Sequence, residues 1–419
     1  MTAQAERLSD ISPQQWKSGS AAWFGWLFDG LELHLYTLVA TPLVVHLLGA
    51  ASSADPAVKE KSAFIQAGFL VGWALGGAFF GRLGDRIGRS RALALTILTY
   101  ALCTGLCAAA QTWWQLMIFR FLAALGIGGE WAVGASLLAE TWPSAWRPWL
   151  AAVLQTAVNL GIVVAAGLVT LLSFLPHPPS ERWVFLIGVA PALLVFWIRR
   201  QVPESEAWQR AQADKAPRPG LAQLFQGATA AVTWHTGAVC ALGLSGWWLF
   251  QFWHPQHLRR LLEAAGTPAV ETTRQVSEAF FLVNILAIAG NFAAGWLASK
   301  RGNRSAIVIM LAGMAASMAG AFALPRGFAE LAWFWMPLVG FFSGVFGLFT
   351  MYLPPLFPVL LRTTGAGFCY NIGRLAAAAA SLIFGWAAPV GDFRVALLAA
   401  SGLVLAAAVW TRRLPDDGR

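Results

Sequence analysis

The stretch Gly81-Arg-Leu-Gly-Asp85-Arg86-Ile-Gly-Arg89 lies in a short hydrophilic gap between two long apolar runs, at about 63–83 and 92–110. Its pattern returns in the second half of the chain as Gly295-Trp-Leu-Ala-Ser299-Lys300-Arg-Gly302, again directly after an apolar run. Two polar loops of one pattern, each at the same place in a series of apolar runs, indicate an internal duplication. Parallel repeats of hydrophobic segments are typical of membrane transporters.

The pattern Pro143-x-x-x-Arg147 likewise returns as Pro358-x-x-x-Arg362. Around these repeats the composition is that of a membrane protein, because 58% of the residues are hydrophobic and 12% are charged. Soluble domains carry about 25% charged residues. The net charge of +9 is spread over short gaps between apolar runs and forms no basic stripe, which excludes nucleic acid as a partner. The four cysteines all lie in apolar runs, so we expect packing residues there and no metal or disulfide.

A helix needs about 20 apolar residues to cross a bilayer. Twelve runs reach a suitable length, at about 20–48, 63–83, 92–110, 113–139, 148–174, 183–200, 230–256, 276–298, 305–324, 330–353, 365–388 and 393–411. The longest polar interruption divides them into an N-terminal bundle (1–200), a cytoplasmic linker (201–229) and a C-terminal bundle (230–419). Residues 1–19 lack the apolar core of a cleaved signal peptide, so the first run is expected to remain. Lys and Arg are concentrated in the segments that are inside when both termini are cytoplasmic.

The loop around Asp85 resembles the signature loop of the major facilitator superfamily. Arg120 with the following Gly126-Ile-Gly128-Gly129 resembles that superfamily's second signature, and Pro203-Glu204-Ser205 resembles the motif after its sixth span. The similarity covers nearly the whole chain. It implies an all-α membrane protein with twelve transmembrane helices in two six-helix bundles, which is the major facilitator fold.

Three further stretches look like the proton symporters of organic acids, a group that includes sialate, metabolite and aromatic-acid porters. They are Asp29-Gly-Leu-Glu32, Gly128-Gly-Glu130-Trp131 and Gly365-Ala-Gly-Phe-Cys-Tyr370-Asn371-Ile-Gly-Arg374. The resemblance implies a multi-pass transporter of the plasma membrane, in bacteria the inner membrane, that carries a small organic carboxylate together with protons. We expect it to work by alternating access as a monomer, without a cofactor and without enzymatic activity.

Ionisable side chains inside a span are costly and therefore mark functional candidates. Asp29, Glu32 and Tyr36 are spaced to share one face of the first span. Burial disfavours the charged form of a carboxyl group, so Asp29 and Glu32 are the predicted proton-coupling residues, with Tyr36 beside them in the substrate site. The alternative for both acids is a structural pairing with a neighbouring arginine or backbone group.

Arg374 is the predicted anchor of the substrate carboxylate, because a guanidinium can grip a carboxylate with two hydrogen bonds. Tyr370 and Asn371 precede it on the same span and extend the polar face. Arg120 is either a second anchor or a partner of the coupling carboxylates. The alternatives are a fixed ion pair with a first-span acid for Arg374 and a structural, helix-tying role for Arg120.

Asn284, Trp247 and Gln251 complete the predicted substrate site from the seventh and eighth spans. Asn284 belongs to a polar stripe, while Trp247 and Gln251 lie at mid-depth where they can form a wall for the apolar part of a substrate. Helix bridging for Asn284 and packing for Trp247 are the alternatives. We therefore expect these three residues to contribute shape more than charge.

Asp85, Arg86, Arg89 and Glu130 are the predicted gating residues. Asp85 can bind the N-terminus of a facing helix or an arginine in one conformation and release it in another. Ser299 stands where the second half would need an aspartate, so a second latch should be weaker or absent. Glu130 is ten residues after Arg120, too far along the helix to pair with it, and a structural role near the cytoplasmic end is its alternative.

Other functions fit the sequence less well. A sugar or polyol:proton symporter would be expected to carry paired glutamines in the seventh span and a Pro-Glu-Thr motif in the tail, and both are missing. A drug or metabolite exporter is disfavoured because Arg374 and Arg120 would repel cationic drugs. An enzyme would need a nucleophile–base or metal constellation, and a sensor would usually add a soluble domain. Neither feature is seen in the sequence.

Overall fold

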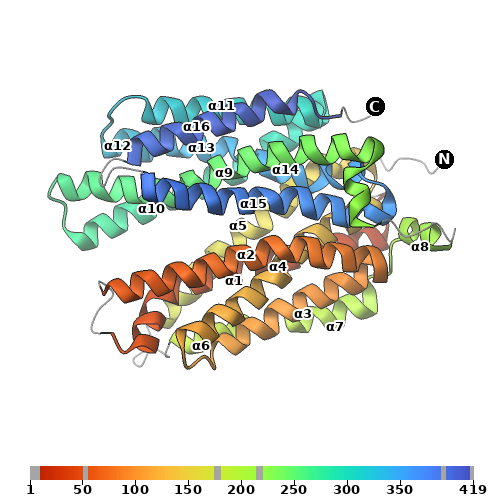
Figure 1. Ribbon diagram of the computed structural model, residues 1–419, viewed down its shortest axis with the longest axis horizontal. Coiled ribbons are helices and arrows are strands. Elements are labelled where there is room, and N and C mark those ends of the chain that lie inside the picture. Colours follow the sequence, from red (N-terminus) through yellow and green to blue (C-terminus); the bar gives the residue numbers. More distant parts are fainter. Residues whose placement is uncertain (1–9, 51–54, 174–180, 214–219, 388–392, 416–419) are drawn as a thin grey trace. The chain divides into compact units, whose positions relative to one another are not determined.

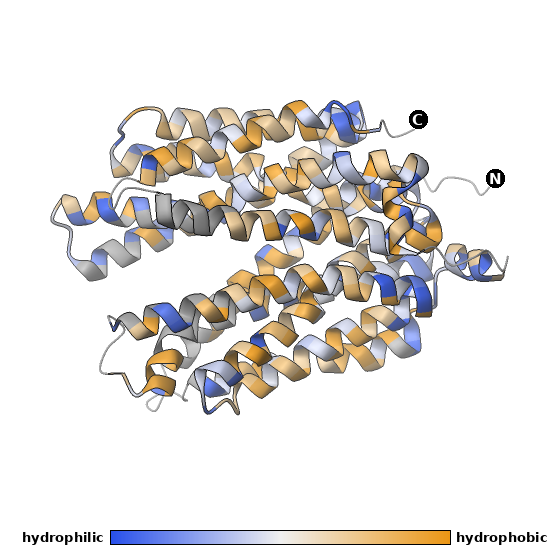
Figure 2. Ribbon diagram, viewed as in Figure 1, coloured by the Kyte–Doolittle hydropathy of each residue, from blue (hydrophilic) through white to orange (hydrophobic). Residues whose placement is uncertain are grey.

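The computed structural model describes residues 10–50, 55–173, 181–213, 220–387 and 393–415, apart from the side chains of residues 33–42 and of some others within the helices. Over these ranges the chain forms helices joined by short turns, without a strand (Figure 1). The predicted all-α fold class is thereby confirmed. The hydropathy colouring shows apolar helices whose hydrophilic residues gather mostly near the helix ends (Figure 2).

Contacts divide the chain into two compact units. Unit 1 comprises Met1–Ala145, Thr156–Leu221 and Phe357–Asn371, and unit 2 comprises Trp146–Gln155, Ala222–Leu356 and Ile372–Arg419. Two helices, α5 and α15, therefore have their first turns in one unit and the rest in the other. The predicted domain boundaries at 200 and 230 stay a prediction.

The helices of the first half follow the predicted apolar runs. They are α1 (Pro13–Leu48), α2 (Pro56–Ile87), α3 (Arg89–Cys107), α4 (Trp113–Thr141), α5 (Arg147–Ser173), α6 (Glu181–Ile187), α7 (Ala192–Gln201) and α8 (Glu206–Ala213). The predicted single span at 183–200 is interrupted between α6 and α7. Pro191 stands just before α7 and has no N–H to continue a helical hydrogen-bond ladder, which explains the break.

The second half is similarly built. Its helices are α9 (Gly227–Ala264), α10 (Ala269–Arg301), α11 (Asn303–Phe322), α12 (Phe328–Glu330), α13 (Met336–Phe342), α14 (Val345–Tyr352), α15 (Arg362–Ala387) and α16 (Phe393–Thr411). The predicted tenth span is assembled from α12, a π-helical segment at Leu331–Trp335, α13 and α14. A continuous helix was expected over 330–353, and the structure interrupts it at Ser343–Gly344.

Eight helices among the described residues are long and apolar enough to cross a membrane. They lie in α2, α3, α4, α5, α10, α11, α12–α14 and α16. The remaining predicted spans correspond to α1, α6–α7, α9 and α15, which all contain side chains outside the description. Several membrane crossings are therefore present, whereas the count of twelve and the location of both termini stay predictions.

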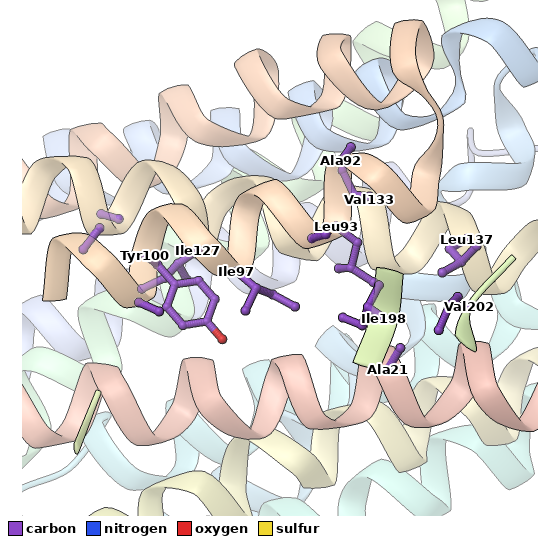
Figure 3. Packing of buried hydrophobic residues seen from close by; sticks show 14 of the residues in the cluster. Ala21, Ala92, Leu93, Ile97, Tyr100, Ile127, Val133, Leu137, Ile198 and Val202 are labelled. Atoms are coloured by element: carbon purple, nitrogen blue, oxygen red, sulfur yellow. The ribbon is translucent and has the colours of Figure 1, made fainter. Parts of the chain in front are cut away.

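Helix α4 is the packing centre of unit 1, since α1, α2 and α3 all lie along it. A buried cluster of α3 and α4 side chains, joined by residues of α1 and α7, fills the interior (Figure 3). Glycines permit the close crossing of α2 and α4, because a Cβ on Gly76 or Gly128 would overlap the carbonyl of Leu125 or Trp73. In unit 2, α9 lies along α16, which also packs on α11.

Candidate functional site

Glu32 and Arg120 form an ion pair in the interior of unit 1. Both side chains are fully buried. The Thr104 hydroxyl donates a hydrogen bond of 2.9 Å to Glu32 Oε1, and the Arg120 guanidinium lies 4.3 Å from the ring centroid of Phe69. Helices α1, α2, α3 and α4 each supply one of these side chains. The charge of Glu32 is therefore compensated within the unit, and Arg120 is the partner of a first-span acid.

Glu130 of α4 lies close to Asp29 of α1, and neither of its carboxyl oxygens accepts a hydrogen bond from a described residue. Glu130 is fully buried, and α1 makes room for it with Gly25, where a Cβ would overlap the Glu130 carboxyl group. An isolated carboxylate is costly to bury, so this position favours the neutral form of Glu130 or a partner that approaches it during function.

Tyr100 of α3 lies within electrostatic range of Glu130, Asp29 and Glu32. Its ring is fully buried at one end of the α3–α4 cluster, and no described residue forms a hydrogen bond with its hydroxyl (Figure 3). A buried hydroxyl group without a partner is uncommon in proteins. The Tyr100 hydroxyl near the three acids thus has an unused capacity for hydrogen bonding.

The structure regroups the acids that the sequence placed together. Asp29 and Glu32 share a helix, as predicted, but they interact with different partners on α4. Glu130, predicted as a gating or structural residue, lies beside Asp29. Tyr36, the third residue of the predicted face, has a side chain outside the described residues.

An aromatic stack adjoins the acids. Trp131 follows Glu130 directly, and its ring stacks on Tyr370 at a centroid distance of 4.0 Å with an interplanar angle of 11°. Trp26 of α1 lies on Trp131 as well, at 6.4 Å and 24°. The indole N–H of Trp26 is buried without a hydrogen-bond partner among the described residues. Sequence reasoning predicted Tyr370 as a site residue but missed both tryptophans, because a Trp in an apolar run looks like a packing residue.

The other predicted α15 residues are divided between the units. Asn371 belongs to unit 1, where its Nδ2 donates a hydrogen bond of 2.9 Å to the carbonyl of Gly367 in its own helix. Arg374 belongs to unit 2 and is 6% exposed. The preceding Gly373 packs tightly on the carbonyl of Cys240 in α9. A buried arginine within an apolar helix is a candidate functional residue, and its role as substrate anchor stays a prediction.

The predicted wall residues all lie in unit 2. Trp247 packs on Phe250 and Phe346, each at a centroid distance of 5.8 Å. Asn284 donates a hydrogen bond of 2.8 Å to Phe280 O in its own helix. Gln251 is half-buried, and its Oε1 has no partner among the described residues. The packing of Trp247 supports its structural alternative, while Gln251 keeps an acceptor available.

Asp85 caps the first turn of α15, inside unit 1. Its carboxylate accepts hydrogen bonds from the backbone N–H groups of Thr363 at 3.3 Å and Thr364 at 2.9 Å, and from the Thr364 hydroxyl. Arg89 lies 3.1 Å from Asp85 Oδ1. An acidic side chain at a helix N-terminus is stabilised by the unpaired N–H groups and by the helix dipole. The sequence predicted this type of contact for Asp85.

Arg89 connects this cap to α4 and to the turn before α15. It forms a buried ion pair with Glu140 at 3.0 Å and donates a hydrogen bond of 2.6 Å to Val359 O. Glu140 also pairs with Arg362 at 3.1 Å. We call Asp85, Arg89, Glu140 and Arg362 the Asp85 network. Arg86, predicted with them, is exposed to solvent.

Glu204 adds a second cap. Its carboxylate accepts hydrogen bonds from the backbone N–H of Arg89 at 2.6 Å and of Ser90 at 3.2 Å, at the start of α3. Gly88 has φ +103°, which favours glycine, and a Cβ there would overlap Glu204. Sequence reasoning quoted Pro203-Glu204-Ser205 without assigning this role, and it missed Glu140. For Glu204 and for Glu140, the available signal in the sequence was an acidic residue next to a polar loop.

Among the described residues, no group of three or more His, Cys, Asp or Glu side chains could hold a metal ion. The four cysteines are free thiols, of which Cys107 donates a weak hydrogen bond to Cys103 O within α3. The chemistry of the described interior is therefore that of carboxyl groups, arginines and aromatic rings.

Comparison with known proteins agrees with this picture. The profile of the Major Facilitator Superfamily matches residues 23–354. A probable 4-methylmuconolactone transporter of Cupriavidus pinatubonensis is 33% identical over 87% of this chain and 81% of its own length. The niacin transporter of Acinetobacter baylyi is 30% identical over 86% and 84%. The solved structure of a proton:xylose symporter has a TM-score of 0.78 at 17% identity, covering 96% of both chains. The chain therefore belongs to the Major Facilitator Superfamily and is a multi-pass membrane transporter, not an enzyme.

Proposed function

We propose that the protein is a proton-coupled symporter of a small, planar organic carboxylate and works by alternating access. The observation that carries this proposal is a cluster of acids inside unit 1. Tyr100 lies near the carboxyl groups of Asp29, Glu32 and Glu130, and Glu130 is fully buried with neither of its oxygens hydrogen-bonded among the described residues. A buried carboxylate without such partners is very costly, so the cluster favours a bound proton. A proton-binding interior is what coupling to a proton gradient requires.

The substrate class follows from the relatives and from the site. Two of the matched proteins are named as transporters of 4-methylmuconolactone and of niacin, and niacin is a planar aromatic carboxylic acid. The Trp131–Tyr370 stack offers aromatic surface suited to such a ring. Tyr370 and Arg374 are four residues apart in α15, which places them on one face of that helix. Because Arg120 is occupied by Glu32, Arg374 is the proposed carboxylate anchor.

Proton binding by the cluster also balances the charge of the transport cycle. An anionic substrate that enters together with a proton adds no net charge to the occupied protein, which lowers the cost of reorientation within the bilayer. Location in a bacterial inner membrane, cytoplasmic termini and activity as a monomer belong to this proposal. A sugar:proton symporter is the second candidate, but its support is a likeness of fold with the xylose symporter.

The test of the substrate class uses matched analogues in proteoliposomes. Niacin and nicotinamide share a ring but differ in charge, since the amide replaces the carboxylate. We expect saturable uptake of niacin or of related planar carboxylates and no uptake of nicotinamide or xylose. Uptake of xylose with no transport of any carboxylate would overturn the proposal in favour of the sugar symporter.

A further inference from the structure

We propose that Trp131 selects planar rings in the substrate, and that Tyr370 holds the place of the substrate ring on Trp131 until the substrate displaces it. This inference rests on the proposed function, because it takes a planar carboxylate as the substrate. It adds the residue that recognises the ring and the residue that competes with the ring for the same surface.

The stack of Trp131 and Tyr370 has the geometry of a bound aromatic ligand. The two rings are nearly parallel, at a centroid distance of 4.0 Å and an interplanar angle of 11°, and both side chains are buried. A planar aromatic ligand stacks on an indole ring in the same way. Tyr370 therefore presents to Trp131 the kind of surface that a substrate ring would present.

Trp131 is the fixed member of the stack. It belongs to α4, the packing centre of unit 1, and its ring also lies on the buried Trp26 of α1. The indole of Trp131 is thus held between side chains of different helices, and α1 and α4 fix two of the three rings. A ring that enters the stack has to take the place of Tyr370.

Tyr370 is carried by a helix that leaves unit 1 directly after it. The α15 residues up to Asn371 belong to unit 1, and those from Ile372 onwards belong to unit 2. A movement of α15 together with its longer part in unit 2 would draw Tyr370 away from Trp131 and open the face of the indole. Alternating access consists of movements of one half of a transporter against the other.

Displacement explains why the shape of the ring would matter. A planar ring replaces the stacking that Tyr370 gives up, whereas a puckered saturated ring does not. Stacking between aromatic rings corresponds to about three- to tenfold in affinity. The closed stack is also a competing state, so Tyr370 lowers the apparent affinity for any ligand of Trp131.

The test compares benzoate with cyclohexanecarboxylate, which share a six-membered ring and a carboxylate but differ in planarity. Their dissociation constants are obtained from the concentration dependence of the melting temperature of the purified protein in detergent. For the wild type we expect benzoate to bind about three- to tenfold more tightly than cyclohexanecarboxylate. Trp131→Leu should remove this preference, and Trp131→Phe should retain part of it. Trp296→Leu, on an exposed position of α10, is the control and should keep the full preference.

Tyr370→Leu should have an effect of the opposite sign. Without the competing ring, benzoate should bind about three- to tenfold more tightly than it binds to the wild type. The preference over cyclohexanecarboxylate should persist, because Trp131 is intact. Mere damage to the site would weaken binding instead. This variant tests the displacement even where Trp131→Leu fails to fold.

Gly367→Ala loosens the stack without altering either ring. Its Cβ would lie 2.6 Å from the carbonyl oxygen of Gly77 in α2 and 2.9 Å from the Cβ of Ala132 in α4, so α15 has to shift. We expect benzoate to bind more tightly to this variant as well. Gly402→Ala on α16 is the matched control, because its Cβ would meet no atom within 4 Å.

The outcomes separate this inference from the proposed function. Wild-type protein that binds neither niacin nor any other planar carboxylate would overturn the proposed function and the inference with it. Equal affinity of the wild type for benzoate and cyclohexanecarboxylate, or an unchanged preference in Trp131→Leu, would refute ring selection by Trp131 alone. Tyr370→Leu that binds benzoate no more tightly than the wild type would refute the displacement.

Discussion

At the scale of single residues, the interior of unit 1 contains two buried carboxyl groups in opposite situations. Glu32 of α1 forms an ion pair with Arg120, whereas Glu130 of α4 has no hydrogen-bond partner among the described residues. The physical difference is the Arg120 guanidinium beside Glu32. Two buried acids of one unit can therefore have separate roles.

The ion pair gives a prediction about stability. Glu32→Gln should lower the free energy of unfolding by about 3–5 kcal/mol, because it leaves the buried Arg120 charge without a counter-ion. Replacing both partners, as in Glu32→Gln with Arg120→Met, should recover much of that loss. Thermal melting of the purified protein in detergent measures both effects, and a wild-type melting temperature for Glu32→Gln would contradict the assignment.

Arg374 gives a prediction about substrate binding. Arg374→Ala should abolish uptake of every accepted carboxylate while leaving the melting temperature close to that of the wild type. Arg374→Lys keeps the charge but loses the two-pronged hydrogen bonding, so a large loss of apparent affinity is expected with some transport retained. Uptake kinetics in proteoliposomes provide the measurement, and normal uptake by Arg374→Ala would remove Arg374 as the anchor.

The sequence was sufficient to find the buried ionisable groups but not to pair them. Asp29, Glu32, Arg120 and Glu130 stand out because charges interrupt apolar runs. Their partners depend on how α1 packs against α4. Spacing within one helix shows which residues share a face, but it does not show which residues of a second helix lie opposite that face. The role of Gly25, which makes room for Glu130, becomes visible only when both helices are placed.

At the scale of elements, the first turn of α15 belongs to unit 1 and is capped by Asp85. In unit 2 the corresponding residue, Ser299, instead bonds to Trp296 O in its own helix and is exposed. The predicted asymmetry between the repeats agrees with these contacts. A gating role for the Asp85 network stays a prediction.

This role can be tested with a native thiol. Cys369 is fully buried in the α15 segment that Asp85 caps. Asp85→Asn removes the charge that holds this helix start, a contribution of about 1 kcal/mol or more in a buried setting. In a background with the other three cysteines changed to serine, we expect a membrane-permeant thiol reagent to label Cys369 faster in Asp85→Asn. An equal labelling rate would argue that the cap does not restrain α15.

At the scale of the whole molecule, composition and apolar runs predicted the all-α membrane fold. The internal duplication that the repeated loop indicates stays a prediction. The continuity of helices was less predictable. Pro191 separates α6 from α7 in a run that hydropathy alone reads as one span, and a π-helical segment at Leu331–Trp335 enters the tenth. Hydropathy measures transfer into lipid and is insensitive to such local backbone changes.

The central claim is that carboxylate and proton cross together. Its most direct test records labelled niacin uptake and internal pH in the same wild-type proteoliposomes, with and without an imposed proton gradient. We predict internal acidification that depends on the carboxylate, in fixed proportion to its uptake, and accumulation that disappears when the gradient is removed. Carboxylate uptake without acidification, unchanged by the gradient, would contradict the account.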